Sequence, residues 1–412
     1  MGGVSMEWKE VDIEQTSIEI IDGDRGKNYP KNNELTNSGY CLFLSAANVT
    51  KNGLQFSNNS FITKEKDALL RKGKLMPKDI VLTTRGTVGN VGFYSDDVPY
   101  PNMRINSGMV IIRPGEDFDT MFLYQYLRSC YFRAQITQFQ SGSAQPQLPI
   151  STLQKMKVIK PDIDAQRRIA SILSSLDRKI ELNNKINADL EEMAQAIFKN
   201  WFVDFEPFKD GKFVDSELGM IPEGWKVGTL GDITKNKSAK VKERNDVKVL
   251  SPVTTGELVL SEEYFTKQVF SSSIAKYKIV NKGDFAYNPA RVNIGSLGRN
   301  EFDFDGCVSP VYVVFSVLDG YENYFDLFRK TDFFKDSVAS LAIGGVRQSL
   351  SYDDLSSIEV IIPSENAVEE FNNLYNQMKK TIKANKLENS RLSLLRDTLL
   401  PRLMSGELEV PE

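Results

Sequence analysis

The sequence predicts an α+β protein. Two similar α/β globules are joined by two long helices, which are packed as an antiparallel coiled coil with internal pseudo-twofold symmetry. The first observation is a repeat: Gly142 aligns with Gly344 and Pro161 with Pro363, an offset of 202 residues, with no gap between them. The second is heptad spacing of apolar residues after each repeat. Two copies of one unit imply an internal near-twofold axis.

The first globule is expected over residues 1–162. Strand-like apolar runs occur at 40–44, 80–83 and 109–112, separated by turns rich in Gly, Asn and Pro. Residues 118–138 place apolar side chains on one helical face, which predicts a helix. Pro161-Asp162 closes the globule.

The first long helix is expected within residues 163–206. No Pro or Gly occurs from Asp164 to Asn200, helix formers dominate, and Asp164 is a suitable N-cap. With Ile169 at heptad position a, the d positions include Ile172, and the seam is imperfect near Lys179. The a positions are Ile169, Leu176, Asn183, Leu190 and Ile197.

A turn-rich linker and the second globule are expected over residues 207–363, and the second helix over 364–412. Trp225-Lys-Val opens the second globule as Trp8-Lys-Glu opens the first, and residues 277–287 resemble 72–82. The second helix repeats the heptad pattern. Its a positions are Phe371, Met378, Asn385, Leu392 and Leu399.

Asn183 and Asn385 occupy the same heptad position, each near the middle of its helix. In an antiparallel pair we expect the two amides to meet at the crossing point. A buried Asn pair costs stability but penalises slipped registers that leave an amide unsatisfied. The alternative is that both amides face solvent on separate amphipathic helices.

Composition excludes several kinds of chemistry. The 412-residue chain has no His, which removes the usual general base and the commonest transition-metal ligand. Its three Cys residues fit no zinc spacing and no disulfide framework, which suggests a reducing compartment. No apolar run approaches the ~20 residues of a membrane span. The N-terminus lacks the apolar region of a signal peptide. We therefore expect a cytoplasmic protein without a membrane partner.

Net charge is −4, but positive residues gather between residues 70 and 113, where a local basic face would suit phosphate binding. A solvated face is the alternative. Arg suits guanine, and Asn or Gln suits adenine, through paired hydrogen bonds in the major groove. Arg85 and Arg291 each follow a strand-like run and precede a Gly at the same distance, at Gly89 and Gly295. The candidate DNA-binding residues, all polar and in loops near positive charge, are Asn48, Thr84, Arg85, Thr87, Asn90, Arg104, Asn106, Gln145, Gln147, Thr254, Thr255, Asn288, Arg291, Asn293, Arg347 and Gln348.

A helix of ~35 residues is ~50 Å long. Globules at its two ends would contact DNA one to two helical turns apart, since a turn is ~34 Å. The pattern thus suits a ruler that reads two separated DNA segments.

Catalytic motifs are weak. Pro161-Asp162 with Asp177-Arg-Lys179 matches the letters of a PD-(D/E)xK nuclease, but Asp177 and Lys179 fall inside the predicted heptad helix. Asn288-Pro-Ala-Arg291 lacks the second Pro and the aromatic of the adenine-methyltransferase motif. A stand-alone nuclease or methyltransferase, and a coiled-coil interaction scaffold with no DNA role, remain as alternatives.

An aromatic patch closes the first helix. Its members are Phe198, Trp201, Phe202 and Phe205. They could be core, but we favour a docking surface for a partner protein, because Trp and Phe are enriched at interface centres.

Several of these segments resemble the specificity (S) subunit of a type I restriction–modification system. Residues 165–184 resemble the central repeat of that family, 198–205 the stretch that follows it, and 395–408 its C-terminal ending. Lys78-Asp-Ile-Val-Leu-Thr-Thr-Arg85 is similar to a strand motif of its target-recognition domains. The similarity covers essentially the whole chain.

The resemblance implies two target-recognition domains, each reading one half of a bipartite site in double-stranded DNA, with the helices fixing the gap. It implies assembly with two methyltransferase (modification) subunits that use S-adenosylmethionine. It also implies restriction subunits that use ATP and Mg²⁺. The chain itself would be a non-catalytic subunit without a cofactor or metal of its own.

Overall fold

The computed structural model describes residues 8–140, 146–265, 270–271, 273–341, 349–408 and 410, and these form two compact units. Unit 1 consists of Met1–Asn183 and Lys386–Glu412, and unit 2 of Asn184–Asn385. Each unit contains one globule, half of one long helix and half of the other. The sequence prediction treated the helices as separate spacers, whereas the structure divides each helix between the two units.

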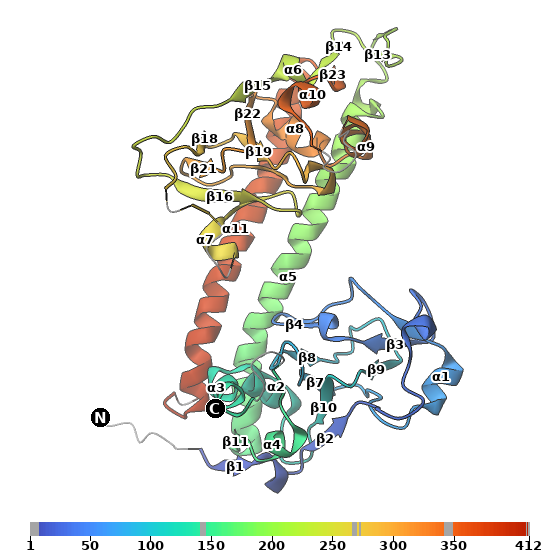
Figure 1. Ribbon diagram of the computed structural model, residues 1–412, viewed down its shortest axis with the longest axis vertical. Helices are drawn as coiled ribbons and strands as arrows, with labels where there is room; N and C mark the ends of the chain where they lie inside the picture. Colours follow the sequence, from blue (N-terminus) through green and yellow to red (C-terminus); the bar gives the residue numbers. More distant parts are fainter. Residues whose placement is uncertain are drawn as a thin grey trace. The chain divides into compact units, whose positions relative to one another are not determined.

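The globule of unit 1 is built on a four-stranded antiparallel sheet of order β2-β10-β7-β8 and a smaller sheet of order β6-β3-β9. Its elements, drawn in blue to green in Figure 1, are β1 (Glu10–Asp12), η1 (Ile13–Gln15), β2 (Glu19–Asp22), η2 (Asn32–Glu34), β3 (Cys41–Leu44), η3 (Ala46–Asn48), β4 (Val49–Thr50), β5 (Gly53–Leu54), β6 (Phe61–Ile62), α1 (Lys64–Leu69), β7 (Ile80–Thr83), β8 (Val91–Phe93), β9 (Met103–Ile105), β10 (Met109–Arg113), α2 (Thr120–Arg128), α3 (Cys130–Phe139), α4 (Ile150–Gln154) and β11 (Lys157–Ile159).

The three predicted strands are confirmed as β3, β7 and β10, whose apolar residues are buried. The single helix predicted over 118–138 is wrong, because two helices occupy this segment. Ser129 is extended (φ −66°, ψ 158°), and its hydroxyl accepts from the backbone N–H of Phe132. This cap ends α2 and begins α3, and apolar periodicity alone does not reveal such a break.

Unit 2 repeats the same plan, with a four-stranded sheet of order β15-β22-β19-β20. Its elements are η4 (Glu206–Phe208), β12 (Phe213–Val214), β13 (Ile221–Pro222), β14 (Lys226–Thr229), α6 (Leu230–Ile233), β15 (Thr234–Lys237), β16 (Lys248–Pro252), β17 (Leu258–Leu260), α7 (Ser261–Tyr264), β18 (Lys278–Val280), β19 (Phe285–Tyr287), η5 (Val292–Ile294), β20 (Leu297–Arg299), β21 (Gly306–Val308), β22 (Val313–Val317), α8 (Glu322–Phe328), α9 (Asp332–Leu341), α10 (Tyr352–Ser356) and β23 (Glu359–Ile362).

The two globules share their main four-stranded sheet and the strands that close them. β1 pairs with β11 in unit 1 and β14 with β23 in unit 2, so each globule is closed by its first and last strands. A long helix follows the closing strand in both cases: α5 (Ile163–Phe202) and α11 (Glu365–Met404). The sequence repeat is therefore a repeat of topology, and loops with the same place in the two sheets can be compared directly.

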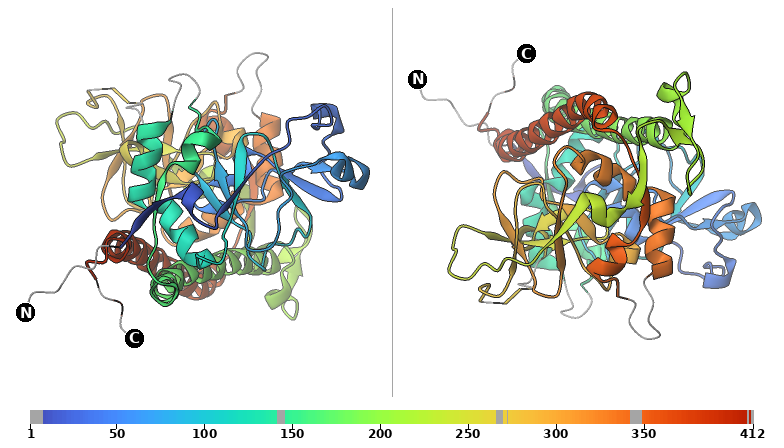
Figure 2. Two further views of the ribbon diagram at one scale, coloured as in Figure 1. Left: turned by 90° about the horizontal axis from the view of Figure 1, so that it is seen from below. Right: turned by 90° about the horizontal axis from the view of Figure 1, so that it is seen from above.

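Within each unit, α5 and α11 lie side by side and run antiparallel (Figures 1 and 2). In unit 1, Asp177 binds Arg396 and Asn183 binds Asn389, so one residue number rises as the other falls. In unit 2, Asn187 binds Asn385. The predicted antiparallel pairing is confirmed.

The predicted contact between Asn183 and Asn385 is wrong. Asn183 Nδ2 donates to Asn389 Oδ1 at 2.9 Å and to Glu388 Oε2 at 2.7 Å, whereas Asn385 Nδ2 donates to Asn187 Oδ1 at 2.9 Å. Each helix carries another Asn one turn later, at Asn187 in α5 and Asn389 in α11. The antiparallel register therefore places Asn183 opposite Asn389 and Asn385 opposite Asn187. Asn183 and Asn385 occupy the same heptad position, so they would face each other only if the two helices crossed at that position.

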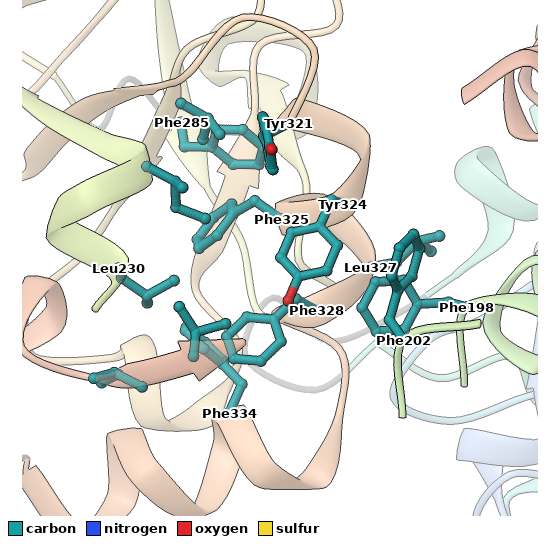
Figure 3. Close-up of a cluster of buried hydrophobic side chains, with 14 of the residues drawn as sticks. Phe198, Phe202, Leu230, Phe285, Tyr321, Tyr324, Phe325, Leu327, Phe328 and Phe334 are labelled. Carbon is teal, nitrogen blue, oxygen red and sulfur yellow. The ribbon is translucent and has the colours of Figure 1, made fainter. Parts of the chain in front are cut away.

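The aromatic patch at the end of α5 belongs to the core of unit 2 (Figure 3), so its prediction as a docking surface is wrong. Phe198 and Phe202 are 1% and 5% exposed and contact Phe371. Trp201 and Phe205 are half-buried, and their rings also pack on aromatic neighbours. The linker after α5 folds back, with Phe205 in a left-handed conformation (φ 55°), and its Phe208 and Trp225 rings pack on Trp201 and Phe202.

Candidate nucleic-acid interface

Equivalent loops at the same end of the β2-β10-β7-β8 sheet and the β15-β22-β19-β20 sheet carry Arg85 and Arg291. The β7–β8 loop of unit 1 holds Arg85, and the β19–β20 loop of unit 2 holds Arg291. In each loop a Gly with φ 93° follows four residues later, at Gly89 and Gly295. This left-handed conformation suits Gly, so both loops turn at the same place for the same physical reason.

Backbone contacts fix the Arg85 loop at one end of the sheet. The N–H groups of Thr84 and Arg85 donate to Gly108 O at 2.8 and 3.1 Å, which joins the loop to the β9–β10 turn. Arg85 also forms a β-bridge with Gln147, just before α4. Three segments distant in sequence thus bring the predicted residues Arg85, Asn106 and Gln147 to one end, and the exposed Thr87 lies in the same loop.

The Arg85 side chain is exposed and makes no hydrogen bond or ion pair with any residue that the structure describes. A guanidinium group without an internal partner can donate up to five N–H groups to a ligand. Asn106 uses its Oδ1 to accept from Gly108 N at 2.9 Å, which orients the side chain in the turn.

The prediction of Arg104 as a DNA-binding residue is wrong. Arg104 is 6% exposed and donates to the Asp67 carboxylate and to the backbone oxygens of Asp67, Leu70 and Lys72. Lys74 Nζ joins the same carboxylate at 2.6 Å. Burial would raise the pKa of Asp67, but its hydrogen bonds and the two positive charges hold it below the usual value. This network holds the C-terminal end of α1 and the segment that follows it, and it uses four of the five guanidinium N–H groups of a side chain that is already buried.

Asn48, Asn90 and Thr84 are also structural, so their prediction as base readers is wrong. Asn48 is 1% exposed, and its amide donates to Gln55 O and Asn58 O. Asn90 Nδ2 donates to Val49 O at 2.8 Å. Thr84 is 4% exposed. Polar side chains in such turns form hydrogen bonds with backbone groups that have no partner in the sheets. The residue type alone does not distinguish this structural role from ligand binding.

In unit 2 the β19–β20 loop packs closely on the β16–β17 turn. Ser296 Oγ donates to Pro252 O at 2.8 Å, and a Cβ on Gly295 would lie 2.7 Å from Thr254 O. The exposed Thr254, Thr255, Arg291 and Asn293 therefore lie at the same end of the sheet. The Arg291 side chain, like that of Arg85, has no hydrogen bond or ion pair with a described residue.

Asn288 is half-buried at the start of this loop. Its Oδ1 accepts from Ala290 N at 3.1 Å, so the side chain stabilises a turn and half of its amide is already used. Pro289 O accepts from Leu350 N, just as Thr84 O accepts from Leu148 N in unit 1. Gln145, Arg347 and Gln348 lie outside the described residues.

The sequence prediction missed the turn between β21 and β22. Tyr287, the last residue of β19, pairs with Val313, the first of β22, so the preceding Ser309–Tyr312 turn lies at the same sheet end as the Arg291 loop. Its counterpart in unit 1 is the Asn106–Gly108 turn. Comparing the two repeats strand by strand would have found it.

The letters of the nuclease motif do not form a site. Asp177 lies within α5 and accepts from Gln125, Arg128 and Arg396 at 2.6, 3.0 and 2.7 Å. Asp162 accepts from Ala165 N and caps the same helix, and Lys179 pairs with Glu388. Within the described ranges, no cluster of three or more Asp, Glu or Cys residues is arranged to hold a metal ion.

Comparison with known proteins places this architecture. Residues 7–192 match the family model described as type I restriction modification DNA specificity domain. The C-terminus of a putative type I specificity protein of Mycoplasma pneumoniae, S.MpnORF289P, is 32% identical over 115 residues, which are 28% of this chain and 72% of the relative. The chain belongs to the family of type I restriction–modification specificity subunits.

Full-length similarity supports the same family. The specificity subunit of the type I restriction enzyme MjaIX from Methanocaldococcus jannaschii is 28% identical over 352 residues, which cover 82% of this specificity subunit and 80% of the relative. A crystal structure of the S subunit from M. genitalium shares the fold, with a TM-score of 0.57, 16% identity and coverage of 100% and 98%. In the part of this subunit that the structure describes, no helix has the length and apolarity to cross a membrane.

Proposed function

We propose that this chain is the DNA-reading subunit of a type I restriction–modification complex. Unit 1 reads one half of a bipartite site in double-stranded DNA and unit 2 reads the other, while α5 and α11 set the unread gap. The observation that carries this proposal is the pair of equivalent loops with Arg85 and Arg291, two exposed guanidinium groups without internal partners among the described residues.

The chemistry of these loops suits base reading. A guanidinium group donates two parallel hydrogen bonds to O6 and N7 of guanine, and the amides of Gln147 and Asn293 can bind adenine in the same paired way. Backbone hydrogen bonds hold both loops on their sheets, so little conformational entropy is lost on binding. Thr87, Asn106, Thr254 and Thr255 supply further donors and acceptors at the same sheet ends.

Catalysis then belongs to partner subunits. Two modification subunits would bind S-adenosylmethionine and methylate adenine, and restriction subunits would use ATP and Mg²⁺. The carboxylate that comes nearest to a catalytic motif in this chain, Asp177, is already paired with two Arg side chains, which supports a non-catalytic role. Such a complex would act on the chromosome in the cytoplasm.

A methylation map tests the proposal. The chain would be co-expressed with its modification subunit, and N6-methyladenine would be located by long-read sequencing. The expected result is one split motif with two short half-sites and a fixed gap. A complex shown to be assembled that adds methyl groups at no split motif would contradict the proposal.

A further inference from the structure

Two aliphatic side chains stand out at the sheet end of unit 2 that carries Arg291. Ile294 in η5 is 56% exposed and Val311 in the β21–β22 turn is 70% exposed. Single exposed apolar residues are common on protein surfaces and need no explanation. Here two of them occupy neighbouring loops at one end of one sheet, beside an exposed Arg without an internal partner among the described residues.

The backbone around Ile294 is fixed. Ile294 N donates to Arg291 O at 3.1 Å, Gly295 N donates to Val292 O at 3.0 Å, and Val292 is buried. Arg291 is the N-cap of this turn, so Arg291 and Ile294 are two exposed residues of one short, hydrogen-bonded loop. α9 packs against this turn from within the unit. Ile294 is therefore exposed on a backbone that hydrogen bonds and packing hold in place.

Val311 is presented in a similar way. Tyr312 N donates to Ser309 O at 3.0 Å and closes a turn with Pro310 at its second position, which favours this geometry. Lys278 Nζ donates to Tyr312 O at 2.6 Å, and the side chain of Tyr312 packs on an apolar cluster. The turn is anchored on both sides, and the Val311 side chain lies outside it.

Unit 1 differs at the equivalent positions. Its β9–β10 turn presents Asn106 and Ser107 in place of Pro310 and Val311. Among the described residues of the β7–β8 loop, this turn and the segment 146–148, no large apolar side chain is exposed. The two reading surfaces therefore have different chemistry: unit 1 is polar, whereas unit 2 combines a positive charge with two aliphatic contacts.

We propose that Ile294 and Val311 contact thymine 5-methyl groups in the major groove, and that the half-site read by unit 2 contains at least one thymine recognised in this way. The 5-methyl group is the apolar feature that distinguishes thymine in the major groove, and aliphatic side chains recognise it by contact. Arg291, in the same loop as Ile294, contacts a neighbouring guanine or phosphate. This inference rests on the proposed function and adds the base chemistry of one half-site.

The test replaces thymine by deoxyuridine, which removes the 5-methyl group and keeps the base pair. The complex of this chain with its modification subunits would be titrated, at one salt concentration, with duplexes that carry the selected split motif. Each thymine would be replaced in turn. The half-site of unit 2 is identified as the one whose selection changes when residues 207–363 are exchanged for another recognition domain.

At least one replacement in that half-site is expected to raise the Kd about fourfold, the effect of one buried methyl group of ~0.8 kcal/mol. In the Ile294→Ala or Val311→Ala complex, the same replacement should have no further effect. Replacements in the other half-site should change the Kd less than about twofold. Leu318→Ala is the matched control, because Leu318 is 51% exposed and follows the opposite end of β22. Its complex should respond to deoxyuridine as the unchanged complex does.

A half-site of unit 2 without thymine on either strand would overturn the inference, as would a Kd insensitive to every replacement. A third result would also overturn it. If deoxyuridine still raises the Kd of both the Ile294→Ala and the Val311→Ala complex, another residue makes the methyl contact. In these cases the split motif is still selected and the proposed function stands. Failure to select any split motif would instead remove the proposed function, and the inference with it.

Discussion

Nδ2 of Asn183 lies 2.9 Å from Oδ1 of Asn389, and both residues are held between α5 and α11 in unit 1. The same arrangement joins Asn385 to Asn187 in unit 2. Asn187 precedes Asn389 by the same 202 residues that separate Asn183 from Asn385. The duplication has therefore produced two equivalent polar contacts between α5 and α11, Asn183–Asn389 and Asn385–Asn187.

Replacing Asn183 by Leu should destabilise the protein by about 1–3 kcal/mol, because Asn389 and Glu388 lose a buried donor. Replacing Asn183 and Asn389 together by Leu should recover most of this loss. Asn183 Oδ1 is buried without a partner among the described residues, so the apolar pair removes an unsatisfied group as well. Urea unfolding of the natural protein, the two single variants Asn183→Leu and Asn389→Leu, and the double variant gives the interaction energy between the two side chains. The Asn187–Asn385 pair provides a second, matched cycle. Additive losses would contradict the pairing.

Asp177→Asn should cost about 2 kcal/mol at neutral pH, because Arg128 and Arg396 lose their charged partner. Burial of Asp177 would raise the pKa of its carboxyl group, but the charge of Arg128, with the hydrogen bonds of Gln125 and Arg396, holds that pKa below its usual value. A lowered folded-state pKa gives stability that is present above the unfolded pKa, about 4, and is lost as pH falls through the folded value.

The stability difference between Asp177→Asn and the natural chain should therefore be constant from about pH 8 to 5 and shrink below about pH 4. Denaturant titrations across this range measure it. Asp189→Asn, an exposed change on the same helix, is the control and should leave stability within about 0.5 kcal/mol. A difference that persists unchanged in acid would show that the carboxylate is not the stabilising group.

Arg85→Ala and Arg291→Ala should each relax selection at one half-site and leave the other intact. The loss of a paired contact to guanine is worth about 1–3 kcal/mol of discrimination. Methylation maps of the two variant complexes measure the effect. Arg244→Ala is the control, because Arg244 is paired with Asp246 and Asp305. It precedes β16, whereas the Arg291 loop packs on the turn that follows β16. Equal relaxation of both half-sites by one substitution would contradict the assignment.

Phe202→Ala should destabilise unit 2 by about 3–5 kcal/mol, since Phe202 is 5% exposed among Phe198, Tyr324 and Phe371. Val203→Ala changes the next residue, which is 52% exposed, and should have little effect. Thermal unfolding compares the two. A stable Phe202→Ala protein that fails only to bind its partners would restore the docking role that the structure argues against.

Insertion of one heptad in each of α5 and α11, at facing positions, should lengthen the unread gap by about three base pairs. Seven residues add ~10 Å of helix, and a base pair adds ~3.4 Å along DNA. The methylation map of the variant complex should show unchanged half-sites. Insertion in one helix alone should disrupt the register and abolish activity. An unchanged gap after the double insertion would contradict the ruler function of the helices.

The sequence by itself determined the duplication, the heptad helices, the three apolar strands and the equivalence of Arg85 with Arg291. These features are local or periodic, and local patterns follow from chain geometry and burial. The tertiary structure alone decided which polar residues face solvent. Asn48, Asn90 and Arg104 resemble ligand-binding residues in sequence, yet they satisfy backbone and carboxylate groups supplied by distant segments. Phe198 and Phe202 are core because Tyr324 of α8 and Phe371 of α11 pack on both rings. Burial depends on contacts between segments far apart in the chain, and no spacing within one segment encodes it.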